Sequence, residues 1–267
     1  QEDPLPGSLP SDGVITEGPS SPEPSLGDLA EEGAPTSLTP DPGAVTANAL
    51  APVDNEGVPY AMGPPRALDP DKPMVALTFD DGPSRNTADI LALFDQYGGR
   101  GTFFMVGNRI QQYSDITKQV LEQGSEIASH TWDHKKLPSI SNGEIRQEFQ
   151  AVIDVVESIT GARPRFVRPP YGAVDDKVKA VGAEMGIAFV NWNIDTLDWK
   201  TRDAKATYDA VMAEVADGSI VLCHDLHDDT GEAMKLVIPE RARQGYPRVT
   251  VSELFEAKGI EGEGGAE

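Results

Sequence analysis

Residues 74–83 read MVALTFDDGP, a short apolar run that ends in two adjacent aspartates and a Gly-Pro turn. The run over 74–79 has the length and composition of a buried strand. Asp80, Asp81 and the Gly-Pro pair are ordinary turn formers. This stretch alone therefore predicts a strand and a turn, and the rest of the chain decides whether the two carboxylates have a function.

Strand-like and helix-like segments alternate along the chain, about six times and with short connections. Strands are predicted at 74–79, 101–106, 125–130, 165–168, 188–193, 219–224 and 246–251, and helices at 87–97, 113–123, 141–159, 175–185, 204–216 and 232–243. The helix over 141–159 has the clearest ends, because Ser141 and Glu144 have capping-box spacing and Gly161 occupies a C-cap position. Such alternation predicts an α/β fold with a parallel sheet covered by helices. At roughly 190 residues the folded part is shorter than the ~250 of a complete eightfold barrel, so an incomplete barrel and an open doubly wound sheet both remain open.

The chain of 267 residues carries 22 basic and 44 acidic side chains, a net charge of −22. This acidity argues against nucleic acid or an anionic membrane surface as a partner, because both are bound by clusters of Lys and Arg. Residues 1–70 hold twelve acidic residues and one base and are rich in proline, which predicts a disordered linker. We expect a folded domain at 71–258 and a flexible, Gly- and Glu-rich tail at 259–267.

The sequence has no run that is long and apolar enough to span a bilayer. Its one cysteine, Cys223, excludes an internal disulfide and is expected to pack in the core, since neighbours on a strand point to opposite faces. The chain begins at Gln1. We expect a trimmed, monomeric form whose signal or anchor is missing, located outside the cell or in the cell envelope.

Polar side chains follow five of the predicted strands at the point where each strand ends. The segments are Asp80-Asp81, HTWDH (130–134), RPPYG (168–172), DTLDW (195–199) and HD (224–225). In parallel α/β folds the active site lies at the carboxyl ends of the strands. Three of the four histidines of the chain lie in these segments, so their position makes Asp80 and Asp81 site candidates.

His130 and His134 have the spacing of two metal ligands, with three residues between them. A catalytic zinc site needs about three protein ligands and an open position for water, and one carboxylate of Asp80 and Asp81 would complete it. The other carboxylate would act as general base towards the water that the metal activates. Spacing alone does not decide which aspartate has which role.

The remaining polar segments supply partners for such a base and for an acid. Arg168 would keep the base ionised, because a nearby positive charge favours the carboxylate. His224 would be the general acid, with Asp198 orienting it and supporting its positive charge. Together the residues predict metal-assisted hydrolysis at a carbonyl group.

Taken in order, these segments resemble the motifs of the polysaccharide deacetylase family, the NodB-homology domains of carbohydrate esterase family 4. The resemblance covers about 73–255 and rests on TFDDG (78–82), HTWDH (130–134), RPPYG (168–172), DTLDW (195–199) and LCHD (222–225). It implies a distorted, incomplete (β/α) barrel that removes acetyl groups from sugars. It also implies a bound divalent metal, usually zinc, with cobalt or another transition metal as the alternative.

The resemblance assigns the roles that spacing leaves open. It implies that Asp81, His130 and His134 are the metal ligands. It implies that Asp80 is the general base and that Arg168 orients it.

The same resemblance implies the groups that act on the substrate. The backbone N–H of Tyr171 would help to hold the oxyanion. His224, with Asp198 behind it, would give a proton to the leaving amine or alcohol. Trp199 and Leu222 resemble the apolar walls that accept the acetyl methyl group.

Three functions are compatible with this resemblance. The favoured one is a metal-dependent deacetylase, which uses metal-activated water on a polysaccharide that contains N-acetylglucosamine, of the peptidoglycan or chitin type. The alternatives are an O-acetyl esterase on acetyl-xylan and a carbohydrate-binding protein that has lost its chemistry. The base, the three ligands and the acid are all retained, which argues against loss of chemistry.

Overall fold

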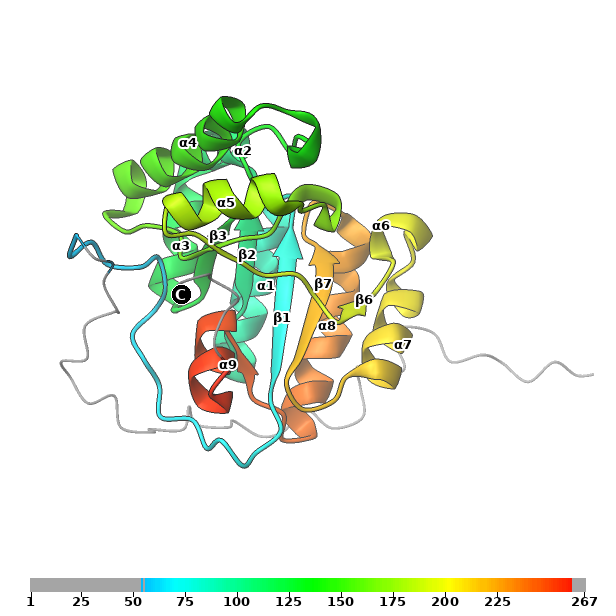
Figure 1. Cartoon of the computed structure of the whole chain (residues 1–267). Helices are drawn as coiled ribbons and strands as arrows, with labels where there is room; N and C mark the ends of the chain where they lie inside the picture. The colour runs from blue at the N-terminus through cyan, green and yellow to red at the C-terminus, as the bar shows by residue number, and fades with distance from the viewer. Residues whose placement is uncertain (1–53, 55, 261–267) are drawn as a thin grey trace, which may run out of the picture. The chain divides into compact units, whose positions relative to one another are not determined.

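A parallel sheet of eight strands forms the core of the computed structural model (Figure 1). The structure describes residue 54 and residues 56–260, so most of the linker expected at 1–70 and most of the tail expected at 259–267 lie outside these residues. The strands are β1 (Val75–Asp80), β2 (Thr102–Met105), β3 (Glu126–Ser129), β4 (Phe166–Val167), β5 (Ala188–Phe189), β6 (Ile194–Asp195), β7 (Ser219–His224) and β8 (Arg248–Val249).

The strand order is that of a barrel with one gap. The sheet runs β5-β4-β3-β2-β1-β7-β6, and β8 pairs with the first residues of β1. β5 and β6 follow each other along the chain, yet they form the two edges of the sheet, and no pairing joins them within the described residues. A doubly wound sheet would instead reverse its strand order at a switch point. The structure therefore confirms the distorted, incomplete (β/α) barrel.

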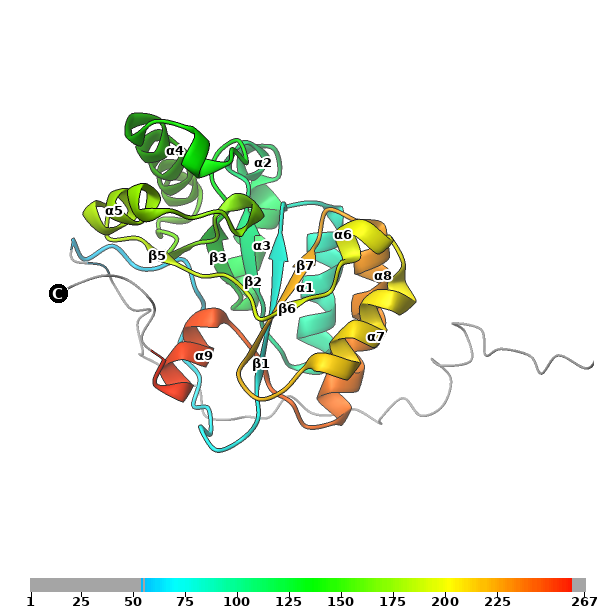
Figure 2. The ribbon, with the colours of Figure 1, turned by 45° about the vertical axis from the view of Figure 1, so that its right-hand side comes forward.

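Helices surround the curled sheet (Figures 1 and 2). They are α1 (Arg85–Tyr97), α2 (Gly107–Gln112), α3 (Ser114–Gln123), α4 (Asn142–Thr160), α5 (Asp176–Glu184), α6 (Asp198–Thr201), α7 (Ala204–Glu214), α8 (Asp228–Arg243) and α9 (Val251–Lys258). In both views α1 and α8 lie side by side next to β1 and β7, and α9 lies near the amino-terminal end of β1. None of the helices described is long and apolar enough to cross a membrane.

The alternation of β1 divides the core into an outer and an inner layer. Phe79 packs outward against the helices, in a cluster with Phe94 of α1. Ala76 faces the interior of the barrel, in a cluster with Leu254 of α9. Because successive side chains of a strand point to opposite faces, Asp80 also points inward. β1 thus delivers a carboxylate to the carboxyl end of the barrel interior.

Most predicted elements are present, and the differences concern short ones. α4 begins at the predicted capping box of Ser141 and Glu144 and ends at Gly161, whose φ is 72°. The strand predicted over 188–193 is confined to β5, and the one over 246–251 is confined to β8, because α9 already begins at Val251. α2, α6 and α9 are absent from the prediction because they have at most eight residues, too few to establish a hydrophobic period.

Residues 56–70 pack against the barrel, although their composition predicts a linker. Ala61 is 1% exposed, and its carbonyl accepts a hydrogen bond of 2.8 Å from the N–H of Ile127 in β3. Arg66 forms an ion pair of 2.8 Å with the buried carboxylate of Glu253 in α9. The segment makes these contacts in an irregular conformation, so no apolar period marks it in the sequence.

Candidate active site

The predicted site residues gather where the carboxyl ends of the strands meet. Ion pairs, ring contacts and strand register connect Asp80, Asp81, His130, His134, Arg168, Tyr171, Asp198 and His224. They come from the ends of β1, β3, β4 and β7 and from the start of α6. The parallel sheet thus converts five separate segments of sequence into one cluster.

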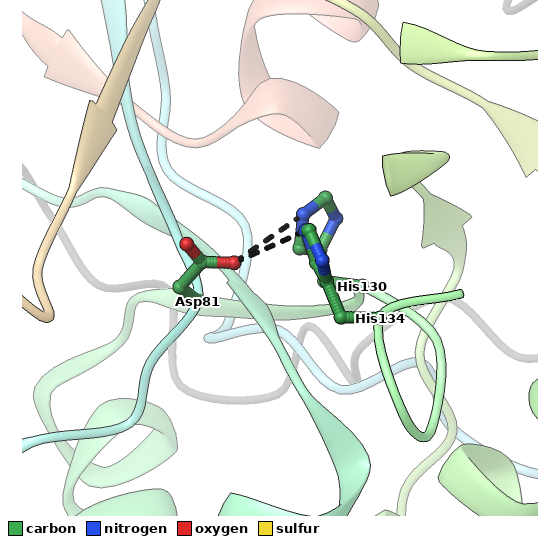
Figure 3. A group of neighbouring side chains, drawn as sticks. All are labelled: Asp81, His130 and His134. Carbon is green, nitrogen blue, oxygen red and sulfur yellow. Dashed lines mark ion pairs between the residues drawn. The ribbon is translucent and has the colours of Figure 1, made fainter. Parts of the chain in front are cut away.

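Asp81, His130 and His134 form a group of three donors whose ligand atoms lie within 4.8 Å of one another (Figure 3). Oδ1 of Asp81 is 3.4 Å from Nε2 of His134 and 3.6 Å from Nε2 of His130. Nδ1 of His130 lies 2.7 Å from the carbonyl of Arg168, which turns Nε2 towards the group. Burial lowers the pKa of His130 to about 3, so the ring is neutral, as a metal ligand must be.

Three residues at this site have a left-handed backbone conformation. Asp81, His134 and Tyr171 have φ values of 69°, 56° and 62°, a region that costs a residue with a side chain on the order of 1–3 kcal/mol. Gly82 follows Asp81 at a point where an added Cβ would overlap the carboxyl group of Asp225. Close packing of this turn therefore needs a glycine.

Asp80 and Arg168 form an ion pair inside the barrel. Nη1 of Arg168 donates to Oδ1 of Asp80 at 2.7 Å, and both side chains are at most 3% exposed. Oδ2 of Asp80 lies 3.7 Å from Nε2 of His130. Burial raises the pKa of Asp80 above its ordinary value, against the lowering effect of the Arg168 charge.

Asp198 and His224 form a second pair on another side of the site. Nδ1 of His224 is 2.8 Å from Oδ1 of Asp198, and the backbone N–H of His224 donates to Oδ2 at 2.7 Å. Burial alone would lower the pKa of His224, but the hydrogen bond and the charge of Asp198 outweigh it and raise that pKa to about 8. The imidazole therefore holds a proton near neutral pH.

The three residues expected to contact the substrate differ in exposure. Leu222 is 3% exposed and lies in register with Thr78, so its side chain points into the barrel on the same face as His224. Trp199 and Tyr171 are 50% and 68% exposed. The ring of Tyr171 stands edge-on to His134, with 4.9 Å between the ring centroids.

Three supporting residues escape the sequence-based assignment. Thr78 accepts a hydrogen bond of 2.7 Å from Nη1 of Arg168, and Thr230 donates one of 2.7 Å to Asp198. Asp225 is fully buried, and burial raises its pKa to about 7. Thr78 and Asp225 lie inside recognised motifs, which do not reveal their partners, and Thr230 carries no local signal because its partner is remote in sequence.

The expectation for Cys223 is confirmed. Its side chain is fully buried in the outer core cluster. Burial raises the pKa of its thiol well above the ordinary value, so the residue is a packed core cysteine and not a thiolate nucleophile.

Comparisons with known proteins agree with this arrangement. A family model described as polysaccharide deacetylase matches residues 67–190. The chain is 38% identical over 192 residues to the peptidoglycan-N-acetylmuramic acid deacetylase PdaC of Bacillus subtilis (strain 168); the match covers 72% of this chain and 40% of PdaC. It is 35% identical over 191 residues to a peptidoglycan-N-acetylglucosamine deacetylase of Bacillus cereus, covering 69% of this chain and 89% of that protein. The chain therefore spans about 40% of the length of PdaC.

Solved structures of the same family are also similar to this chain. The structure of PdaC superposes with a TM-score of 0.70 and 37% identity over 72% of this chain and 94% of that chain. A carbohydrate esterase family 4 pseudoenzyme from Bacillus anthracis superposes with a TM-score of 0.64 and 26% identity, over 73% of this chain and 69% of that chain. Fold alone does not separate active from inactive members, so activity has to be argued from the site. With these matches, the chain belongs to the polysaccharide deacetylase family.

Proposed function

We propose that the chain is a metal-dependent deacetylase that hydrolyses the N-acetyl groups of peptidoglycan or a related N-acetylglucosamine polysaccharide. The observation that carries this proposal is the position of Asp80. Its Oδ1 is held by Arg168 at 2.7 Å, while its Oδ2 lies 3.7 Å from Nε2 of His130. A buried carboxylate with one oxygen fixed and the other facing the donor group is the arrangement that a general base needs.

The donor group of Asp81, His130 and His134 fits a divalent metal. Two imidazoles and one carboxylate are a ligand set of catalytic zinc sites, which leave a position for water. His130 is oriented by the Arg168 carbonyl, as ligating histidines usually are by a second partner. When bound, the metal would lower the pKa of a water molecule and polarise the acetyl carbonyl.

The residues of the chain carry the proton transfers in this proposal. Asp80 accepts a proton from the attacking water, whose oxygen bonds to the acetyl carbon. The backbone N–H of Tyr171 stabilises the oxyanion that forms. His224 gives its Nε2 proton to the amine nitrogen as the C–N bond breaks, since its Nδ1 faces Asp198. The products are acetate and a free amine on the sugar.

The choice of an N-acetyl substrate follows from the relatives. The two named deacetylases are described as acting on N-acetyl sugars of peptidoglycan, which favours an amide over an ester and a location outside the cell or in its envelope. Trp199 and Leu222 would form the walls that accept the methyl group. Their exposed and buried positions fit a substrate that enters from the mouth of the barrel.

Acetate release tests this function directly. We expect the protein to release acetate from peptidoglycan and chitooligosaccharides, with less from acetyl-xylan. A chelator should abolish the release and zinc should restore it, and Asp80→Asn serves as a control for contaminating activity. Binding to glycans without acetate release would establish the non-catalytic alternative, and a preference for acetyl-xylan would establish the esterase.

A further inference from the structure

A groove of about 600 Å³ lies beside the candidate active site. His227, which lines it, has its ring centroid 6.3 Å from that of the proposed acid His224. On its other side Arg109 donates from Nε to the carbonyl of Pro83 at 3.1 Å, two residues after Asp81. The groove therefore adjoins the turn that carries Asp81, one of the proposed metal ligands.

The arginines lining this groove outnumber its acidic residues by one, in a chain whose net charge is −22. Its lining includes Arg85, Arg109 and Arg202, against Asp228 and Asp229. Arg85 pairs with Asp228, and Nε of Arg202 lies 3.6 Å from Asp229. Both aspartates of the lining are therefore paired with an arginine, and the third arginine, Arg109, is in neither pair.

Arg109 is the arginine whose guanidinium contacts no carboxylate among the described residues, although its positive charge lowers the pKa of the buried Asp225. It forms no ion pair with any residue that the structure describes, and it is half-buried, with its guanidinium 5.4 Å from the ring centroid of Tyr113. The Pro83 carbonyl engages only its Nε, so the two terminal NH₂ groups remain for a ligand. A guanidinium that is already fixed in place loses little entropy when it binds a carboxylate through two hydrogen bonds.

The chemistry of a muramic acid residue matches this position. Its lactyl ether is on the carbon next to the one that bears the acetamido group, so a carboxyl-bearing substituent neighbours the acetyl group of each muramic acid residue that reaches the donor group. In glycan strands without stem peptides the lactyl group ends in a free carboxylate. In strands with stem peptides the carboxylates belong to the peptide.

We propose that this groove is a subsite for the carboxylate-bearing substituent of muramic acid, with Arg109 as its main anion-binding residue and Arg202 as a second positive charge. The inference rests on the proposed deacetylase function. It makes Arg109 a specificity residue that favours peptidoglycan over a neutral N-acetylglucosamine polymer.

The test compares acetate release from three soluble substrates: a chitooligosaccharide, peptide-free peptidoglycan strands, and strands that carry stem peptides. The measured quantity is the selectivity, the kcat/KM on each peptidoglycan substrate divided by that on the chitooligosaccharide. Arg109→Gln should lower the selectivity about 10-fold, since the variant loses charged hydrogen bonds to the carboxylate. Arg202→Gln should lower it less. The matched control is Arg146→Gln, whose exposed side chain pairs with Glu184, and it should leave the selectivity unchanged.

These substrates distinguish a role of Arg109 in binding the carboxylate from a purely structural role at the Pro83 turn. If Arg109 only braces the Pro83 turn, its loss lowers kcat/KM on all three substrates by one factor, the selectivity stays constant, and the inference is wrong. Arg109→Lys retains the charge without the planar fork, so an intermediate selectivity is expected, and this variant serves if the glutamine variant does not fold. A loss confined to peptide-bearing strands identifies the stem peptide as the ligand, and a loss on both strands identifies the lactyl carboxylate.

The same assay distinguishes the two levels of the proposal. Wild-type protein that releases no acetate from any of the three substrates refutes the deacetylase function, and the subsite with it. Wild-type activity on all three, with a selectivity that neither Arg109 variant changes, refutes the subsite alone.

Discussion

Arg168 ties the proposed general base to a proposed metal ligand: its guanidinium holds Asp80 at 2.7 Å while its backbone carbonyl faces Nδ1 of His130 at 2.7 Å. The side chain is fully buried, and its guanidinium carbon lies 3.9 Å from the ring centroid of Phe104. Thr78 accepts another hydrogen bond from it. One residue of β4's carboxyl end thus fixes the position of both groups relative to each other.

Removing this arginine should destabilise the fold as well as the chemistry. Arg168→Met leaves the Asp80 carboxylate buried without a cation, which typically costs about 3–5 kcal/mol of unfolding free energy. Urea denaturation at pH 7 measures the loss. Arg146→Met is the matched control, because its ion pair with Glu184 is 44% and 59% exposed and such pairs contribute about 0–1 kcal/mol. Equal losses in the two variants would show that burial of the Arg168 pair has no special weight.

Replacing the two adjacent aspartates one at a time should have different effects on metal binding. Asp80→Asn is expected to retain the metal and to lose turnover by at least about 100-fold, since a positioned general base contributes 10²–10⁴-fold. Asp81→Asn and His130→Ala are expected to lose the metal as well, because each removes one of three donors. Zinc content after dialysis, measured beside acetate release, distinguishes the two outcomes. A metal-loaded Asp80→Asn variant with full activity contradicts the assignment of the base.

The pair of His224 and Asp198 should set the basic limb of the pH profile, if His224 is the general acid that we propose. Burial opposes protonation of His224, yet Asp198 raises its pKa to about 8, and a general acid acts only in its protonated form. Activity should therefore fall as the pH rises through about 8. Asp198→Asn removes the raising charge, so the basic limb should move to lower pH. The profile of kcat/KM against pH measures this shift, and an unmoved limb would assign it to another group.

The same pair links pH to stability. The pKa of His224 is raised in the folded state relative to its ordinary value of 6.5. Its stabilising contribution is therefore complete below about pH 6.5 and is lost as the pH rises through about 8. The unfolding free energy, measured by urea denaturation at pH 6 and pH 9, should change less with pH in Asp198→Asn than in the wild-type protein.

The sequence is informative about the site because the carboxyl ends of parallel strands all lie at the same edge of the sheet. Asp80, His130, Arg168 and His224 each stand at or just after the end of a predicted strand, and the sheet brings those ends together. The long strands and helices are predicted from their apolar periods, because each buries apolar side chains in one of the core clusters. The order of the strands, and with it the gap between β5 and β6, comes from the family resemblance and not from these periods.

Contacts between remote segments have no such local pattern. Thr230 reaches Asp198 from the first turn of α8, and a threonine in a helix is common without any such partner. The groove next to His224 depends on side chains from four separate segments, and its net charge is visible only when they are brought together. The packing of residues 56–70 depends likewise on contacts such as the backbone hydrogen bond between Ala61 and Ile127 of β3, which composition does not reveal.

The amino-terminal boundary of the domain can be tested by two deletions. Deleting 1–53 should change the unfolding free energy by no more than about 0.5 kcal/mol, because its Pro-rich, acidic composition cannot bury enough apolar surface to form a core. Deleting 1–70 also removes the buried Ala61 and the ion pair of Arg66 with Glu253. We expect that deletion to cost about 1–3 kcal/mol, the range typical of lost core contacts. Arg100, 2.7 Å from Glu253, keeps that carboxylate paired and limits the loss.

The activity of the two truncated proteins supplies the second half of this test. Neither deletion removes a residue of the proposed site, so both proteins should release acetate from a chitooligosaccharide at a temperature where both are folded. Urea denaturation gives the stability of each, and Arg66→Met in the full chain isolates the share of the ion pair. Equal stability of the two truncated proteins would place the boundary at residue 70, as composition alone predicts. A lower stability of the shorter one places it before Ala61, because the backbone hydrogen bonds of that residue to Ile127 and Arg163 are then part of the folded domain.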